Sequence, residues 1–308
     1  MASTTYNLPP TTSTFFKRKK SRIPQDLIGN IAILKFPRKT FKLIKILKAR
    51  KFLKQHKNLT TVVEKTDKIE GELRTHKTKH LAGLKTKIAT YKENDCTFKF
   101  NIDESYFSPR LSNERKIIAD EVAKIIKPTT DNRQPTTAKS KTINILVLFA
   151  GIAPYPIIIA KRLLSNTDHR IPNTEFHIYA NELNKEANKE AQKNITLNKL
   201  QDYITLLPGD ANKLPRSTKT LTHLNTNTLG KFDIILMPRP NLPNTFLKTA
   251  LKLSKKNTTI FYHGFGTKEE VLNEIKRDTK NKIGKIKIRK AGDIGPYIYR
   301  WQAQFKVK

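Results

Sequence analysis

The stretch from Ile143 to Pro156 constrains the fold more than any other part of the chain. A mostly apolar run at 143–149 predicts a buried strand, and Ala150-Gly151 ends it in a small-residue turn. Pro154 and Pro156 then open an apolar helix. A strand, a tight turn and a helix start form the first half of a βαβ nucleotide site. Because the turn lacks the Gly-x-Gly-x-x-Gly pattern, it favours a small adenosine cofactor without phosphates over a dinucleotide.

Alternating strand and helix patterns continue to the end of the chain. Strands are predicted near 143–149, 175–180, 203–207, 232–237, 258–263, 284–289 and 297–306, and helices near 156–166, 184–198, 243–255 and 267–280. The last two strands leave no room for a helix between them, so we expect an antiparallel hairpin there. Five parallel strands plus this hairpin predict an α/β, Rossmann-like sheet of the methyltransferase type in residues 142–308.

Residues 23–126 have the pattern of a smaller α+β domain that ends in a linking helix. A strand at Ile31–Leu34 precedes a helix over about 39–55, and short β-like runs follow at 61–63, 87–90 and 97–100. The predicted apolar stripe of the helix consists of Phe41, Ile44, Leu47 and Phe52. Residues 127–141, rich in Pro, Thr and Lys, are predicted to be an exposed linker. Residues 1–22 contain no acid and are predicted to be a disordered basic arm.

The charge of the chain points to a polyanionic partner. Sixty Lys and Arg residues against 26 Asp and Glu give a formal net charge of +34, spread over both halves. Such a field favours nucleic acid without implying sequence specificity. Lys42, Lys45 and Lys48 lie three apart on the first helix and could meet phosphates, although a solvated lysine face fits the same spacing. Codon bias or salt adaptation would also produce a basic composition.

Several classes of protein are disfavoured by the composition. No apolar run approaches the roughly 18–20 residues that span a bilayer, so we expect a soluble, cytoplasmic protein. Cys96 is the only cysteine, which excludes a disulfide framework and a cysteine-cluster metal site. Its strand-like context favours an ordinary buried or edge thiol over a nucleophile. No histidine pair has metal-ligand spacing, and nothing indicates a metal, a protein partner or more than a monomer.

Polar residues follow the predicted parallel strands where an adenosine cofactor would need them. Glu182 follows the strand at 176–180, where a carboxylate can accept both ribose hydroxyls. Asp210 follows the next strand, where it or the following backbone amide can hold the adenine edge. A helix N-cap is the competing interpretation for each acid. After the strand at 232–237, the proline-rich segment that starts at Pro238 is expected to border the ligand crevice, unless it is a plain turn.

A second polar constellation lies at 106–115. Ser112 can begin a helix that runs to about Ile126, and this places Arg110, Glu114 and Arg115 together at one helix entrance. From spacing alone, a carboxylate beside two guanidinium groups is more often a structural ion pair. The same arrangement can also hold a proton acceptor beside an anionic substrate.

These segments together resemble one family, the archaeal and eukaryotic tRNA guanine-37 N1-methyltransferases, whose relatives make wyosine-type bases. The resemblance covers residues 23–308 and includes the segments 26–34, 69–74, 106–115, 149–154, 180–184 and 209–211. It implies a class I fold that binds S-adenosylmethionine and a tRNA substrate. It also implies that Glu114 is the general base for guanine N1 and that Arg74 stabilises charge on guanine O6.

The resemblance further implies which residues bind the cofactor and the RNA. The cofactor-side positions are Arg115, Phe149, Ala150, Gly151, Pro154, Glu182, Leu183, Asp210, Ala211 and Pro238. The RNA-side positions are Arg110, Lys42, Lys45 and Lys48.

The chain departs from the family pattern at several places. Val147 stands where the family usually has Asp, Ala153 replaces a glycine, and Pro238 replaces an asparagine that helps to hold the guanine. The linker after Glu114 is longer than usual, and the N-terminal domain of longer relatives is expected to be missing or reduced to residues 1–22. Two alternatives therefore stay open. One is an aminocarboxypropyl transferase of wyosine synthesis, and the other is a non-catalytic RNA-binding homologue.

Overall fold

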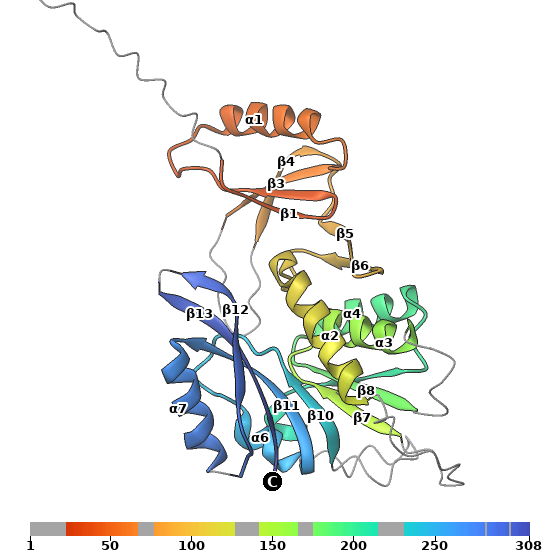
Figure 1. Cartoon of the computed structure of the whole chain (residues 1–308). Coiled ribbons are helices and arrows are strands. Elements are labelled where there is room, and N and C mark those ends of the chain that lie inside the picture. Colours follow the sequence, from red (N-terminus) through yellow and green to blue (C-terminus); the bar gives the residue numbers. More distant parts are fainter. Residues whose placement is uncertain are drawn as a thin grey trace, which may run out of the picture.

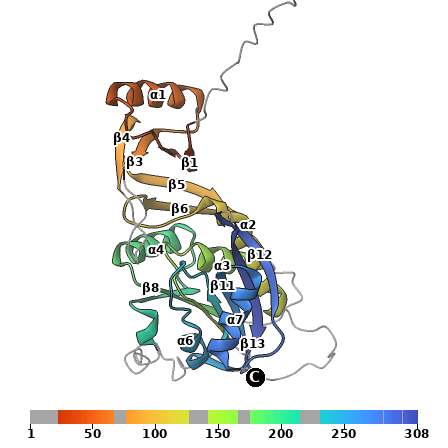
Figure 2. The ribbon, with the colours of Figure 1, turned by 90° about the vertical axis from the view of Figure 1, so that its left-hand side faces the viewer.

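The computed structural model describes residues 23–66, 77–126, 142–165, 175–214, 231–280, 282–295 and 297–308. A small sheet lies above a larger one, and a hairpin and a helix connect them (Figures 1 and 2). The predicted basic arm at 1–22, the predicted linker at 127–141 and Arg74 fall outside the described residues.

A seven-stranded sheet forms the larger part, in the order β12-β13-β11-β10-β7-β8-β9. Its strands are β7 (Ile143–Val147), β8 (Phe176–Glu182), β9 (Ile204–Pro208), β10 (Phe232–Met237), β11 (Ser254–Gly266), β12 (Lys287–Gly295) and β13 (Ile298–Lys306). The strands β7 to β11 are mutually parallel, whereas β13 is antiparallel to both β11 and β12. The prediction of five parallel strands plus a terminal hairpin is confirmed.

Helices cover both faces of this sheet because the strands are apolar on both sides. One face carries α2 (Ser112–Ile126), α3 (Pro154–Ser165) and α4 (Lys185–Leu197), whose apolar residues pack with Ile145 and Ile234. The other carries α6 (Leu247–Lys252) and α7 (Lys268–Thr279), which pack with Leu146 and Ile235. The helix predicted at 243–255 is shorter than expected, since the proline-rich segment and a left-handed Phe246 (φ 59°) precede it. The helix predicted to end near Ile126 is confirmed.

The small sheet has the order β1-β2-β3-β4, with strands β1 (Gln25–Ile28), β2 (Ile31–Leu34), β3 (Thr61–Lys65) and β4 (Thr78–Gly83). Helix α1 (Lys42–Gln55) connects the parallel strands β2 and β3 and covers one face. It buries Ala49 and partly buries Ile46, Phe52 and Leu53. The predicted apolar stripe was wrong at three of its four positions. Phe41, Ile44 and Leu47 are 77%, 42% and 55% exposed, and only Phe52 faces the sheet.

A two-stranded hairpin, β5 (Ile88–Glu93) and β6 (Cys96–Asn101), lies between the two sheets (Figure 2). Its turn residues Asn94 and Asp95 both have positive φ, 47° and 59°, as the tight turns favoured by hairpins require. Cys96 is buried, as predicted, and burial raises the pKa of its thiol to about 12. A thiol held protonated in this way is a packing residue.

Asn194 of α4 and Asn198, which caps the carboxyl end of this helix, fasten the hairpin to α4. Asn198 accepts the backbone N–H of Thr97 (3.0 Å) and donates to the Thr97 carbonyl (2.7 Å), so that it replaces a strand partner at the hairpin edge. Asn194 accepts the backbone N–H of Lys99 at 2.7 Å. These contacts span about one hundred residues of sequence and set the position of β6 against the helix.

We expect Asn198→Ala to lower the free energy of unfolding by about 2 kcal/mol, because it leaves the Thr97 backbone N–H and carbonyl without partners. Urea unfolding followed by circular dichroism measures this change. Gln192→Ala, on the exposed surface of α4, is the control and should change stability by no more than about 0.5 kcal/mol. Equal effects of the two substitutions would contradict the role assigned to Asn198.

Candidate functional site

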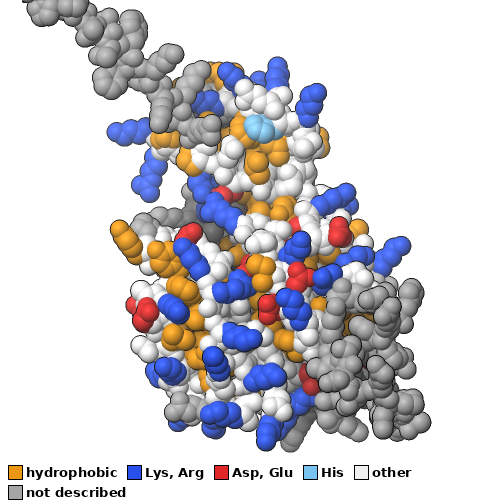
Figure 3. Space-filling view, viewed as in Figure 1, with side chains coloured by type: hydrophobic (Ala, Val, Ile, Leu, Met, Phe, Trp, Pro, Cys, Tyr) orange, Lys and Arg blue, Asp and Glu red, His pale blue; other side chains and the backbone are white. Residues whose placement is uncertain are grey.

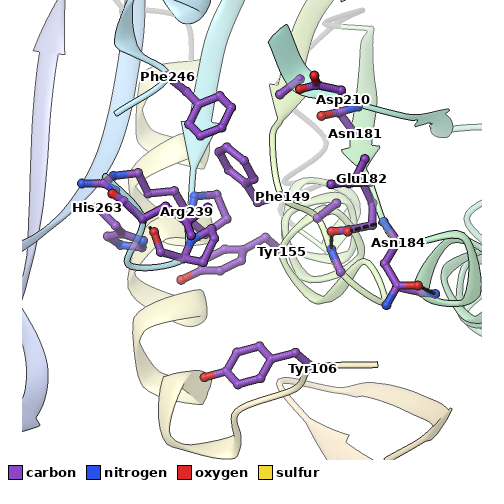
Figure 4. Close-up of a pocket in the computed structure, with 18 of the residues that line it drawn as sticks. Tyr106, Phe149, Tyr155, Asn181, Glu182, Asn184, Asp210, Arg239, Phe246 and His263 are labelled. Atoms are coloured by element: carbon purple, nitrogen blue, oxygen red, sulfur yellow. Dashed lines mark hydrogen bonds between the residues drawn. The ribbon is translucent and has the colours of Figure 1, made fainter. Parts of the chain in front are cut away.

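A cavity of about 610 Å³ lies at the carboxyl ends of the parallel strands, where open α/β sheets bind their ligands. Its wall is built from the turns after β7, β8, β9 and β10 and from the segment before α2 (Figure 4). All ten residues that the sequence placed on the cofactor side line this one cavity: Arg115, Phe149, Ala150, Gly151, Pro154, Glu182, Leu183, Asp210, Ala211 and Pro238.

The turn after β7 has an unusual backbone. Phe149, Gly151 and Ala153 all have positive φ, at 56°, 58° and 66°. Ala153 is fully buried and keeps the left-handed conformation at the position where glycine was expected, which costs an L residue roughly 1–2 kcal/mol. The substitution therefore leaves the shape of the turn intact. A methyl group added at Gly151 would meet nothing closer than 3.8 Å, so the backbone faces open space there.

Glu182 organises the turns after β7 and β8. Its carboxylate accepts the backbone N–H of Gly151 at 2.7 Å and that of Asn184 at 2.8 Å. Burial raises the pKa of Glu182, although these backbone donors oppose the shift. The N-cap of α4 is Asn184, so the capping interpretation of Glu182 was wrong. Asp210, in contrast, does cap the short 3-10 turn at 211–213 by accepting from Asn212 at 2.9 Å.

A buried arginine shapes the wall after β10. Arg239 is 4% exposed and donates to the Tyr262 hydroxyl (2.9 Å), the Leu242 carbonyl (2.8 Å) and the Glu274 carboxylate (2.8 Å). These bonds hold the proline-rich segment against β11 and α7. Arg239 was not among the residues predicted from the sequence, although an arginine between two prolines after a strand was a usable signal. On the cavity wall, the Phe149 and Phe246 rings meet edge to face with centroids 4.8 Å apart.

The three charged residues at the start of α2 do not cluster as predicted, because each has its own partner. Arg110 is exposed and pairs with Asp26 at 2.7 Å. Arg115 is buried with Glu93 of β5, donates to the Ser108 carbonyl at 3.1 Å and lies 4.8 Å from the Phe107 ring centroid. Both arginines are thus in ion pairs, but neither pairs with Glu114, so the ion pair that spacing favoured among these three residues does not form.

Glu114 points to the other side of α2, toward the large sheet. Its carboxylate contacts His263 Nε2 of β11 at 3.0 Å and receives two hydrogen bonds from Arg289 of β12, at 2.7 and 2.9 Å. Burial pushes the pKa of Glu114 upward, but the hydrogen bonds from His263 and Arg289, together with the charge of Arg289, outweigh it and lower the pKa. Burial also lowers the pKa of His263. An ionised carboxylate only accepts, so a neutral His263 donates its Nε2–H to Glu114.

His263 connects Glu114 to the cavity, because it lines the cavity while Glu114 lies behind it. Sequence reasoning missed both His263 and Arg289. A histidine inside the apolar strand at 258–263 was a signal for a buried polar contact, whereas nothing near Arg289 set it apart from its basic neighbours.

The predicted RNA-side lysines fall on α1, on a face of the molecule with many basic side chains (Figure 3). Lys42 and Lys48 are exposed. Lys45 instead is half-buried and pairs with Glu64 of β3 at 2.6 Å, so this lysine contributes to packing between helix and sheet. No group of three His, Cys, Asp or Glu residues in the described ranges could hold a metal ion. No helix within those ranges is long and apolar enough to cross a membrane.

Comparison with known proteins agrees with this architecture. A protein from Nanoarchaeum equitans named tRNA (guanine(37)-N(1))/4-demethylwyosine(37)-methyltransferase Taw22 is 33% identical over 89% of this chain and 96% of its own length. The tRNA (guanine(37)-N(1))-methyltransferase Trm5b from Pyrococcus abyssi is 28% identical over 92% of this chain and 74% of its own. The crystal structure of Trm5b from Pyrococcus abyssi superposes with a TM-score of 0.67 at 26% identity, covering 92% of this chain and 75% of that one.

The TRM5/TYW2 methyltransferase domain matches residues 89–289, a range that includes α2, His263, Arg289, all but the first residue of the hairpin and every residue of the cavity wall except Arg300. The chain belongs to the TRM5/TYW2 methyltransferase family.

Proposed function

We propose that this protein transfers a methyl group from S-adenosylmethionine to N1 of guanine 37 in tRNA. The observation that carries the proposal is the buried Glu114, which lies directly behind the cavity wall and contacts the cavity residue His263. The names of the relatives from Nanoarchaeum equitans and Pyrococcus abyssi support the substrate. Monomeric, cytoplasmic action without a protein partner is part of the same proposal.

The cavity fits S-adenosylmethionine in size and chemistry. Its volume of about 610 Å³ lies in the range typical of small-molecule sites. Glu182 and Asp210 offer carboxylate oxygens for the ribose and adenine, and the bare backbone at Gly151 allows close approach. The buried hydroxyl of Tyr155 lines the cavity without a hydrogen-bond partner within the described structure, as expected of a group that meets a bound polar ligand.

Glu114 is the group suited to remove the proton from guanine N1. It is ionised, because hydrogen bonds from His263 and Arg289 keep its pKa low, and an ionised carboxylate can accept a proton. The loss of this proton makes N1 nucleophilic toward the methyl group that bound S-adenosylmethionine supplies. The negative charge that develops on guanine O6 needs a cation. Arg74 stays our proposal for that role and lies outside the described residues.

The departures from the family pattern do not remove the site. Val147 is buried within the sheet, and Ala153 preserves the backbone of the turn. A non-catalytic homologue is therefore disfavoured. Aminocarboxypropyl transfer is also disfavoured, since both relatives reported above are named methyltransferases. The name of the Nanoarchaeum relative does favour a second substrate, 4-demethylwyosine at position 37.

Glu114→Gln should reduce methyl transfer about 10²–10⁴-fold, because a positioned general base contributes that much, while S-adenosylmethionine binding persists. The assay is incubation with labelled cofactor and tRNA transcripts that carry guanine or adenine at position 37, with calorimetry for cofactor binding. Glu121→Gln removes the same charge from the same helix and is the control. Turnover by Glu114→Gln near that of the control would disprove the assigned role, and equal labelling of both transcripts would disprove the substrate.

Glu182→Gln should weaken S-adenosylmethionine binding roughly 10–100-fold, because hydrogen bonds to a charged acceptor contribute about 1.5–3 kcal/mol. The raised pKa of Glu182 also predicts that wild-type affinity falls as the pH drops toward that pKa, above the ordinary 4.5. The substitution should abolish this pH dependence. Titration calorimetry between pH 5 and pH 8 measures both effects, and Glu186→Gln on α4, a partly exposed acid that does not line the cavity, is the control.

The double substitution Lys42→Ala with Lys48→Ala should weaken tRNA binding and reduce its salt dependence. Two lost phosphate contacts lower the slope of log K against log salt by about 1.8. Lys252→Ala with Lys256→Ala removes the same charge near the amino end of β11, away from the cavity, and should leave the slope closer to that of the wild type. Equal slopes for the two double variants would show that α1 is not a specific RNA contact.

A further inference from the structure

Arg289 holds Glu114 in a state that is poorly suited to accept a proton. Its guanidinium engages both carboxylate oxygens, Oε2 at 2.7 Å and Oε1 at 2.9 Å, while His263 occupies Oε1 as well. Together with the hydrogen bond from His263, the paired guanidinium lowers the pKa of Glu114 against the effect of burial. A general base works best when its pKa lies near the operating pH, so this pair weakens the base that the proposed function requires.

Among the groups around Glu114, Arg289 is the one that can break its contact with the carboxylate. His263 of β11 is neutral and buried, Tyr155 of α3 is buried, and Arg115 of α2 is held by Glu93. Arg300 of β13 has interactions of its own and faces the cavity. The Arg289 side chain is 34% exposed, whereas that of Glu114 is 4% exposed. A side chain that is one-third exposed on an edge strand can move without unpacking the core.

The surroundings of Arg289 are suited to a phosphate. It lies on the edge strand β12, and the segment 280–290 contains Lys280, Lys282, Lys285, Lys287 and Lys290 but no acid. Arginine binds phosphate with the same forked, two-point geometry that it uses for a carboxylate. An RNA backbone that lies along β12 therefore competes with Glu114 for the same guanidinium.

We propose that Arg289 is a substrate-operated latch, which pairs with Glu114 in the free protein and is drawn off onto an RNA phosphate when the substrate binds. This inference rests on the proposed function of Glu114. Release leaves Glu114 buried beside neutral His263, and burial without a cation raises its basicity. The carboxylate then takes the guanine N1 proton, and the neutral acid loses that proton to solvent when product leaves and Arg289 returns. Arg289 is thus a positioning residue that acts through Glu114.

The pH profile of methyl transfer tests the latch. The proteins compared are the wild type, Arg289→Met, Arg289→Lys and Lys287→Met, which removes the same charge two residues away on β12. Because kcat/KM reports the free protein, its acid limb should shift upward by at least about one pH unit in Arg289→Met. The limb should be unshifted in Lys287→Met and partly restored in Arg289→Lys. The single-turnover rate of Arg289→Met, measured with saturating cofactor and tRNA at high pH, should stay within about threefold of the wild-type rate.

Two results would overturn the latch. A loss of about 100-fold or more in the single-turnover rate of Arg289→Met at every pH would show that Arg289 stays on Glu114 during the reaction. An acid limb that does not move would show that Arg289 does not control the basicity of Glu114. Both results require a wild type that methylates guanine 37, so a wild type without that activity counts against the proposed function instead.

A second measurement tests the pairing without any activity. In Arg289→Met, the pKa of Glu114 in the folded protein should rise above its unfolded value near 4.5. The variant should then lose stability as the pH rises from that unfolded value through the raised pKa of the folded protein. The difference in melting temperature from the wild type should therefore grow between pH 4.5 and about pH 7. Arg289→Met combined with Glu114→Gln should abolish this growth. A deficit independent of pH in the single variant would refute the pairing.

Discussion

The buried ion pair between Arg115 and Glu93 is the contact on which the rest of the site depends. The two side chains are 2% and 3% exposed, so both charges have left water completely. Such a pair adds little net stability compared with apolar residues, but loss of one partner costs roughly 3–5 kcal/mol, because the other charge stays buried alone. Its effect here is to fix geometry. One guanidinium joins β5, the Ser108 carbonyl and the Phe107 ring, and thereby determines where α2 begins.

The position of Glu114 follows from this anchor. Successive residues of an α-helix point about 100° apart, so a helix fixed through Arg115 turns Glu114 away from the hairpin and toward the large sheet. There it meets β11 and β12, more than one hundred residues later in the sequence. The catalytic carboxylate of the proposed reaction thus comes from outside the cofactor fold and reaches the cavity from behind, through His263. The asparagine contacts from α4 hold the other side of the same hairpin.

Local patterns predicted the large sheet and the cavity wall because the information they need is local. A strand followed by a small-residue turn at 143–153 places its backbone at the carboxyl edge of the sheet, and the acids after β8 and β9 reach the same edge. The buried face of α1 was not predictable in this way. Its apolar residues lie on both sides of the helix, and Lys45 faces inward because Glu64 of β3 pairs with it. The contacts of Glu114 with His263 and Arg289 were not predictable from local patterns either. They depend on how the terminal hairpin pairs with β11, which the sequence near Glu114 does not encode.

Val147 and Pro238 have no polar side chain where the family usually has one, and neighbouring residues supply polar groups in their place. Val147 is fully buried at the end of β7, in register with Leu236 and Ala180. This strand therefore ends in an apolar residue and not in an acid. The first turn is held instead by Glu182, which takes the Gly151 N–H. Pro238 likewise offers no side-chain amide, and Arg239 is consumed by internal bonds that stiffen its loop. The Asn244 side chain uses its oxygen for the Phe246 N–H and lies on the same wall, so amide donors there come from Asn244 rather than from residue 238.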